Sequence, residues 1–282
     1  MPQPPSTLEG AYLLHQLYRV DWTLWHSLKE KKRKRIQKAS AAQLQALIGE
    51  GEDSGAYYHV LGHKGDLMFL FSRASGEKLA EVERELTTLP IWPFLEPTWS
   101  YFSVVELSLH GAHERYRNLL IQQGLQENTP EWDQALETML EEDRQVQRAR
   151  LYPQIPEQDY ICFYPMDKRR GEVHNWFTLE APDRGKLMSA HGKTGRKYTG
   201  KVTQLISSSM GLDDYDWGVD LFSQDTLNFK KLLYEMRFDA VSALYADFGT
   251  FVIGRRLDPK RLLDLRPWPS AEPTPEADPA EA

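Results

Sequence analysis

Apolar and polar positions along the chain predict the same five elements twice. In the first half, apolar residues at 10–18 predict a strand, and apolar positions at helical spacing predict a long helix over 22–47. Two strands around a glycine-containing turn follow within 57–72, then a helix over 75–86 and a β-rich segment at 100–108. The first half therefore runs strand, helix, hairpin, helix, strand.

The second half repeats this order with negligible sequence identity to the first. Its predicted elements are a strand at 160–166, a helix over 183–201, paired strands at 204–208 and 216–222, a helix over 226–238 capped by Asp225, and a strand at 249–254. This order is typical of a ferredoxin-like α+β unit. We predict an α+β fold in which two ferredoxin-like units form a dimeric α+β barrel with a cavity in one half.

The pattern divides the chain into five segments. The two units are assigned to residues 9–125 and 153–257, and a connecting helix lies between them in 126–152. We expect residues 1–8 to be disordered, and also the proline-rich acidic tail 258–282, which cannot bury enough apolar surface to offset its ordering entropy. The tail could instead dock onto a partner.

The composition is that of an ordinary globular protein, with 282 residues of which 41% are hydrophobic and 27% charged. A net charge of −7 argues against a general nucleic-acid binder, because phosphate contacts need clustered positive charge. No apolar run approaches the roughly 20 residues that span a bilayer, and the start of the chain lacks a secretory signal pattern. One cysteine, Cys162, fits a reducing compartment. We expect a cytoplasmic protein that is not transmembrane.

One predicted strand carries an unusual set of side chains. Strand side chains alternate between faces, so a single face can present Tyr160, Cys162, Tyr164, Met166 and Lys168. A phenol, a thioether and an ammonium along one line suggest the wall of a pocket. From the pattern alone, a half-buried strand followed by a basic turn is the more frequent arrangement.

Positive charge gathers in the second half. Residues 150–206 hold ten lysines and arginines against six acidic residues, in a chain whose net charge is −7. The excess suits an anionic ligand, since arginine pairs with carboxylates through two parallel hydrogen bonds, although a solvated helix face explains it equally well. A second basic run at 29–38 goes most of the way round its helix, which favours contact with water over contact with an anionic membrane or a partner.

The eight histidines include no pair at zinc spacing with the cysteine. His191 lies inside a predicted helix, where its ring could be an axial ligand of haem iron, although a buried core histidine is the more frequent case. The sequence contains no P-loop, dinucleotide fingerprint or GxSxG motif.

Several specific motifs are spread along the second half of the chain. They are Tyr-Pro-Met-Asp-Lys-Arg-Arg at 164–170, Asn-Trp at 175–176, the segments 187–192, 195–198 and 200–202, Asp-Asp-Tyr-Asp-Trp-Gly-Val at 213–219 with Leu-Phe at 221–222, and the segment 229–239. Together they resemble the coproheme decarboxylases, a family of the chlorite-dismutase-like superfamily. The resemblance is weaker at 62–68 and 103–107 and covers roughly residues 8 to 256.

The resemblance implies a definite reaction. Enzymes of this family convert two of the four propionates of iron coproporphyrin III (coproheme) to vinyls with hydrogen peroxide as oxidant, giving haem b and carbon dioxide in the last step of the coproporphyrin-dependent route to haem. It also implies a homopentamer and a transient contact with the upstream coproporphyrin ferrochelatase.

The resemblance also implies roles for eight residues. His191 would be the proximal iron ligand, Tyr164 would carry the radical that takes hydrogen from a propionate, and Lys168 would assist the second decarboxylation. The remaining five would contact the substrate: Arg150, Arg237 and Ser242 at the propionates, Met166 near the porphyrin and Gln204 on the distal side.

Other functions on this fold stay open at this point. Chlorite dismutases carry a distal arginine where this chain has Gln204, and a neutral amide stabilises a developing oxyanion less well. A haem carrier or sensor would need His191 but would have no use for Tyr164 and Lys168. A non-haem interaction scaffold is the third alternative. The chain departs from the family at Phe177 and Leu244, where tyrosine and arginine are common, and in the loop 207–211.

Overall fold

The computed structural model describes residues 7–108 and 112–262 of the chain, and the other residues lie outside its description. In the first half its elements are β1 (Thr7–Val20), α1 (Trp22–Ser27), α2 (Glu30–Leu47), β2 (Ser54–Val60), β3 (Leu67–Arg73), α3 (Gly76–Thr87), η1 (Trp92–Phe94) and β4 (Leu95–Ser108). The connecting region contains α4 (Ala112–Gln122), α5 (Pro130–Val146) and α6 (Arg148–Leu151).

The second half carries the remaining elements. They are β5 (Tyr160–Lys168), η2 (Trp176–Thr178), α7 (Ala181–Arg196), β6 (Thr203–Ser208), β7 (Trp217–Ser223), α8 (Thr226–Met236), α9 (Ala240–Tyr245), β8 (Ala246–Phe248), β9 (Val252–Leu257) and η3 (Pro259–Arg261).

The strands form one antiparallel sheet that closes on itself. Neighbours pair in the order β7-β6-β4-β1-β3-β2-β9-β5-β8, and β7 also pairs with β5. The first half contributes the order β4-β1-β3-β2 and the second β6-β7-β5-β9, and the pairings β4–β6 and β2–β9 join the two. The predicted α+β class is confirmed.

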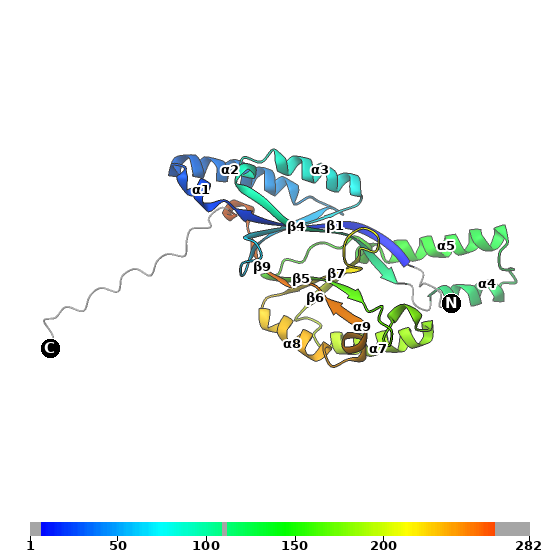
Figure 1. Ribbon diagram of the computed structural model, residues 1–282. Helices are drawn as coiled ribbons and strands as arrows, with labels where there is room; N and C mark the ends of the chain where they lie inside the picture. The colour runs from blue at the N-terminus through cyan, green and yellow to red at the C-terminus, as the bar shows by residue number, and fades with distance from the viewer. Residues whose placement is uncertain (1–6, 109–111, 263–282) are drawn as a thin grey trace, which may run out of the picture.

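Helices cover the outer faces of the sheet in two layers, as Figure 1 shows. On one side, α2 and α3 pack Leu44, Leu79 and Leu86 against the phenyl rings of Phe69 and Phe71. On the other side α7, α8 and α9 lie over the strands of the second half. None of the helices within the described residues is long and apolar enough to cross a membrane.

Several predicted boundaries were wrong. The helix predicted over 22–47 is two helices, because Leu28 and Lys29 are extended between α1 and α2. Both predicted disordered termini contain ordered residues, since β1 begins at Thr7 and the side chain of Leu262 is fully buried. The rest of those termini, 1–6 and 263–282, lies outside the described residues. α4 and α9 were not predicted.

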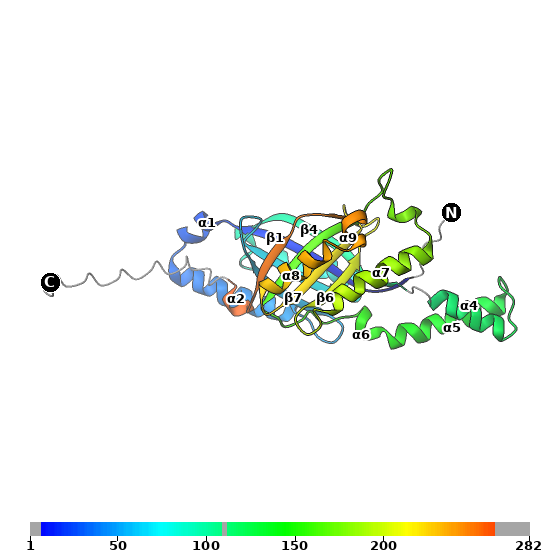
Figure 2. The same ribbon diagram turned by 90° about the horizontal axis from the view of Figure 1, so that it is seen from below.

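An arm formed by α4 and α5 projects from the closed sheet, and Figures 1 and 2 show it from two sides. At its base, α6 packs directly on β1. A Cβ atom at Gly10 would overlap the carbonyl oxygen of Leu151, so only glycine permits this contact. The contact fixes α6, which carries Arg150, against the sheet.

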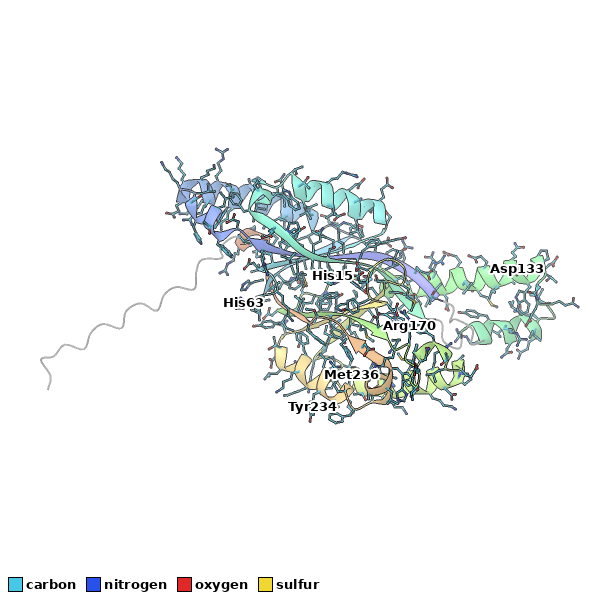
Figure 3. All side chains as sticks on the ribbon, in the orientation of Figure 1. His15, His63, Asp133, Arg170, Tyr234 and Met236 are labelled. Carbon is cyan, nitrogen blue, oxygen red and sulfur yellow. The ribbon has the colours of Figure 1, made fainter. Side chains whose placement is uncertain are left out.

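The interior of the closed sheet holds a buried polar pair. His15 on β1 and Asp220 on β7 are both fully buried, and His15 Nε2 lies 2.9 Å from Asp220 Oδ1. The imidazole also stacks on Phe163, with 4.0 Å between ring centroids. Figure 3 labels His15 between the two helical layers. A buried polar pair of this kind stabilises the fold only while both partners are present.

We expect Asp220→Ala to lower the free energy of unfolding by about 3 kcal/mol, because it leaves His15 buried without its partner. Urea unfolding followed by circular dichroism measures the change. The double variant His15→Leu with Asp220→Leu should lose much less. Equal losses in the single and double variants would contradict this account.

Candidate functional site

The outer face of β5 forms the wall of the candidate site. Cys162 and Tyr164 pack with Val219 and Leu221 of β7 on this face, and Met166 lies against the same cluster. The alternate residues of β5 point into the closed sheet. The predicted shared face is therefore confirmed, and β5 ends at Lys168 on the same face.

Tyr164 is held rigidly in this wall. Its side chain is 4% exposed, and its ring stacks on Phe251 at 4.5 Å between centroids with Phe248 5.8 Å away. Burial raises the pKa of the phenol well above its usual range, so Tyr164 keeps its proton at physiological pH. Burial also raises the pKa of the neighbouring Cys162 thiol to about 12, so this thiol is not a nucleophile.

Two cations lie on the same side of the sheet as the phenol. The guanidinium of Arg237, at the end of α8, lies 3.7 Å from the centroid of the Phe248 ring that neighbours Tyr164. Lys168 is half-buried, and its Nζ lies 4.8 Å from the centroid of Trp176. Burial lowers the pKa of the Lys168 ammonium to about 8, while the Asp239 carboxylate acts in the opposite direction. Near neutral pH the Lys168 ammonium is therefore mostly charged and can face a carboxylate.

His191 on α7 is oriented by a carboxylate that the sequence analysis did not single out. Its Nδ1 lies 3.0 Å from Asp239 Oδ2. Asp239 also caps α9, since its Oδ1 accepts a bond of 3.1 Å from the Ser242 backbone N–H and its Oδ2 accepts one of 3.3 Å from the Ser242 hydroxyl. Nε2 of His191 makes no hydrogen bond within the described part of the chain. This nitrogen is free to bind a ligand.

The helix that carries His191 buries little of its own surface. Arg184 is its only buried side chain, and the helix packs on α8 and α9, where a Cβ at Gly195 would meet Met236 at 3.4 Å. On β6, Gln204 is exposed and Ile206 is 44% exposed. Gln204 pairs with Leu221 in the sheet, which places it on the same face as Tyr164. The wall therefore has the exposed Gln204 at its border, and Asp239 links its Lys168 end to His191.

Arg150 is the one predicted site residue that the structure does not bring into this cluster. It is exposed on α6, and its guanidinium donates a hydrogen bond of 2.9 Å to Gln147 Oε1. The others lie together: Tyr164, Met166, Lys168, His191, Gln204, Arg237 and Ser242 occupy the outer face of the second-half strands and the helices above it. The Asp at 239 with a Ser three residues later is a helix-capping pattern that could have drawn attention to Asp239.

The donor set fits an iron porphyrin better than a bare metal ion. Across the described residues, no three His, Cys, Asp or Glu side chains gather in a way that could hold a metal. An iron bound through His191 would have to bring its other ligands with it, as it does in a porphyrin. The carboxylate on the far nitrogen of the imidazole is the usual arrangement for a histidine that ligates a metal.

The chain is similar to several known proteins. A family model described as chlorite dismutase matches residues 25–257. Coproheme decarboxylase from Staphylococcus saprophyticus is 39% identical over 272 residues, which covers 94% of this chain and 99% of that protein. A putative heme-binding protein from Natronomonas pharaonis is 39% identical over 93% of this chain and 42% of its own length. The structure of a heme-binding protein from Thermus thermophilus superposes with a TM-score of 0.78 at 39% identity, covering 94% of this chain and 99% of that one.

Proposed function

Because the chain belongs to the chlorite dismutase family, we propose that it is an enzyme of haem synthesis that decarboxylates iron coproporphyrin III with hydrogen peroxide. Two propionates become vinyls, and the products are haem b and carbon dioxide. The observation that carries the proposal is the buried phenol of Tyr164 on a strand face that ends at Lys168, with Arg237 against the neighbouring Phe248 ring and His191 held by Asp239. A near full-length coproheme decarboxylase relative at 39% identity supports the same reaction.

His191 and the charged side chains would hold the substrate. Nε2 of His191 would bind the iron, while Asp239 fixes the imidazole through Nδ1 and increases its basicity. Arg237 and Ser242 would bind propionates, whereas Arg150 is bonded to Gln147 outside this cluster and is not assigned a propionate. Met166 would pack on the porphyrin and Gln204 would lie on its distal side. Contacts of moderate strength suit a substrate that has to turn between two decarboxylations.

Tyr164 would transfer the hydrogen. The bound iron porphyrin supplies the oxidising power when it meets peroxide. Tyr164 gives up an electron and its hydroxyl proton, then takes a hydrogen atom from the propionate carbon attached to the ring and is a phenol again. The carbon radical would then give one further electron to the iron porphyrin that peroxide has oxidised, and loss of carbon dioxide would leave the vinyl group. For each propionate, one peroxide is reduced to two waters.

The same site argues against the alternative reactions. Chlorite dismutation needs a cation at the distal position, and the exposed Gln204 is a neutral amide. A haem carrier or sensor would not need a phenol that is 4% exposed on the same strand face as a desolvated lysine. Neither alternative accounts for this pair of residues.

The proposal includes the finer organisation of the fold and its assembly. The strand orders β4-β1-β3-β2 and β6-β7-β5-β9 support two ferredoxin-like units, at residues 9–125 and 153–257 and linked through 126–152, that form a dimeric α+β barrel. We also infer a homopentamer, a transient contact with the coproporphyrin ferrochelatase, and a cytoplasmic location, all from the family resemblance.

The test is to add iron coproporphyrin III and hydrogen peroxide to the purified protein and to identify the porphyrin by chromatography and mass spectrometry. We expect haem b with two equivalents of carbon dioxide. Unchanged coproheme, at peroxide levels that leave the pigment intact, would overturn the proposed function.

We expect Lys168→Ala to stop after one vinyl has formed, because the second propionate then lacks its cation. In the unmodified enzyme, the protonated fraction of Lys168 falls as the pH rises through its pKa of about 8, so the second step should slow above that pH while the first does not. Chromatography of the one-vinyl and two-vinyl products at a series of pH values measures both effects. Lys230→Ala, at an exposed lysine of α8, is the matched control. Normal completion by Lys168→Ala would show that this lysine is dispensable.

A further inference from the structure

Lys168 points at an aromatic ring that a dedicated piece of chain holds in place. Its Nζ lies 4.8 Å from the centroid of Trp176, and within the described residues it forms no hydrogen bond or ion pair. The Trp176 ring is therefore a direct contact of this ammonium, while the Asp239 carboxylate acts on it electrostatically. An ammonium over the face of a tryptophan is attracted by the ring quadrupole, most strongly where water is excluded.

The segment between the two residues folds back on itself. Arg170 and Asn175 form an isolated antiparallel bridge, and the Gly171 N–H donates to the His174 carbonyl at 3.1 Å. The Trp176 N–H donates to the Arg169 carbonyl at 2.9 Å. These bonds close a tight hairpin that returns Trp176 to the end of β5.

Ion pairs fasten this hairpin to its neighbours on both sides. Arg169 Nε lies 2.9 Å from Asp247 Oδ1 on β8. Arg170 Nη2 lies 2.7 and 2.6 Å from the two carboxylate oxygens of Asp216, a residue that is 8% exposed. The Arg169 N–H also donates to the Tyr245 carbonyl at 2.9 Å. A hairpin fixed at several points has little freedom to move its tryptophan.

The ring itself is fixed as well. Trp176 is 8% exposed, and it contacts Tyr245 with 5.7 Å between ring centroids and 61° between ring planes. Asn175 Oδ1 accepts the Phe177 N–H at 3.0 Å and begins η2. Burial around Lys168 agrees with this enclosure, since it lowers the pKa of the ammonium to about 8.

We propose that Trp176 is a positioning residue for Lys168, whose ring fixes the direction in which the ammonium meets the second propionate. The role rests on the proposed decarboxylation. A free lysine side chain samples many rotamers, and a ring held by the protein restricts them before the substrate arrives. The side-chain entropy of Lys168 is then lost on folding and not on substrate binding, so this loss does not reduce the affinity of the ammonium for the propionate carboxylate.

The test compares Trp176→Phe and Trp176→Leu with the unmodified enzyme. Trp176→Leu removes the aromatic face, and we expect the second vinyl to form about tenfold more slowly, with the one-vinyl product accumulating and the first step unchanged. Trp176→Phe keeps a smaller aromatic face and should lie between the two. Trp132→Leu, in the α5 arm next to the Asp133 that Figure 3 labels far from the sheet, is the control.

A second readout needs neither substrate nor turnover. Acetic anhydride labelling followed by mass spectrometry gives the reactivity of Lys168 relative to exposed lysines such as Lys230. We expect Trp176→Leu to raise the relative reactivity of Lys168 severalfold, and Trp176→Phe and Trp132→Leu to change it little. Circular dichroism confirms that each variant is folded.

The outcomes separate this inference from the proposed function. If the unmodified enzyme makes haem b and Trp176→Leu does so without accumulating the one-vinyl product, Trp176 has no positioning role. Unchanged reactivity of Lys168 in folded Trp176→Leu also overturns the inference. If the unmodified enzyme makes no vinyl product, the proposed function fails, and the labelling alone decides whether Trp176 holds Lys168.

Discussion

Tyr164→Phe is expected to bind iron coproporphyrin III normally and to form no vinyl group when peroxide is added. Phenylalanine keeps the ring that stacks on Phe251 but has no hydroxyl to lose a proton and an electron. The site around the ring is apolar and closely packed, so the variant should fold as the unmodified protein does. We expect decarboxylation to fall by about 1,000-fold or more, which corresponds to at least about 4 kcal/mol of barrier.

Product chromatography after single additions of peroxide measures this loss, and titration with iron coproporphyrin III shows that binding is retained. Tyr234→Phe is a matched control, because Tyr234 is 65% exposed on the outer side of α8 and away from the wall of β5. Figure 3 labels this tyrosine at the border of the molecule. Haem b formed by Tyr164→Phe at the unmodified rate would exclude the hydrogen-transfer role.

The arrangement of β5 could be predicted because it depends on local geometry alone. Alternation in a strand puts Tyr164, Met166 and Lys168 on one face whatever the strand packs against, and the structure has them there. Element order was predictable for the same reason. Apolar periodicity located the strands and most of the helices, and the side-chain cap at Asp225 starts α8 as expected.

The contacts that orient the reactive groups could not be predicted in this way. Asp239 meets His191 across 48 residues of sequence, and His15 meets Asp220 across 205, so both contacts depend on how strands and helices pack. The break between α1 and α2 is a change of backbone angle inside a favourable helical pattern, which periodicity cannot detect. Trp176 is near Lys168 in sequence, but the contact between them depends on a hairpin that no strand pattern indicates.

His191→Ala is expected to remove the iron ligation that holds the substrate in register with Tyr164. The variant loses the imidazole whose Nδ1 faces Asp239, and α7 offers no other histidine. We expect affinity for iron coproporphyrin III to fall by at least about 100-fold, and the absorption bands that report axial ligation to change. A titration followed by absorption spectroscopy measures both effects.

Metal-free coproporphyrin III provides the control for His191→Ala, because its propionates still meet Lys168 and Arg237 while no iron is present to be ligated. Its affinity should be similar in both proteins. Unchanged bands with the iron substrate would assign the ligand elsewhere. An equal loss of both porphyrins would mean that the substitution had disturbed the wall rather than the ligand.

Asp239→Asn tests the contact between the Asp239 carboxylate and the imidazole of His191. It keeps His191 but replaces the charged partner by a neutral amide, so the imidazole donates less electron density and the iron should become easier to reduce while ligation persists. A redox titration of the complex with iron coproporphyrin III measures the change in potential. If the imidazole binds iron through Nε2 and is oriented by Asp239, iron ligation should be lost in His191→Ala, while in Asp239→Asn only the reduction potential should change. An unchanged potential in Asp239→Asn would contradict that orientation.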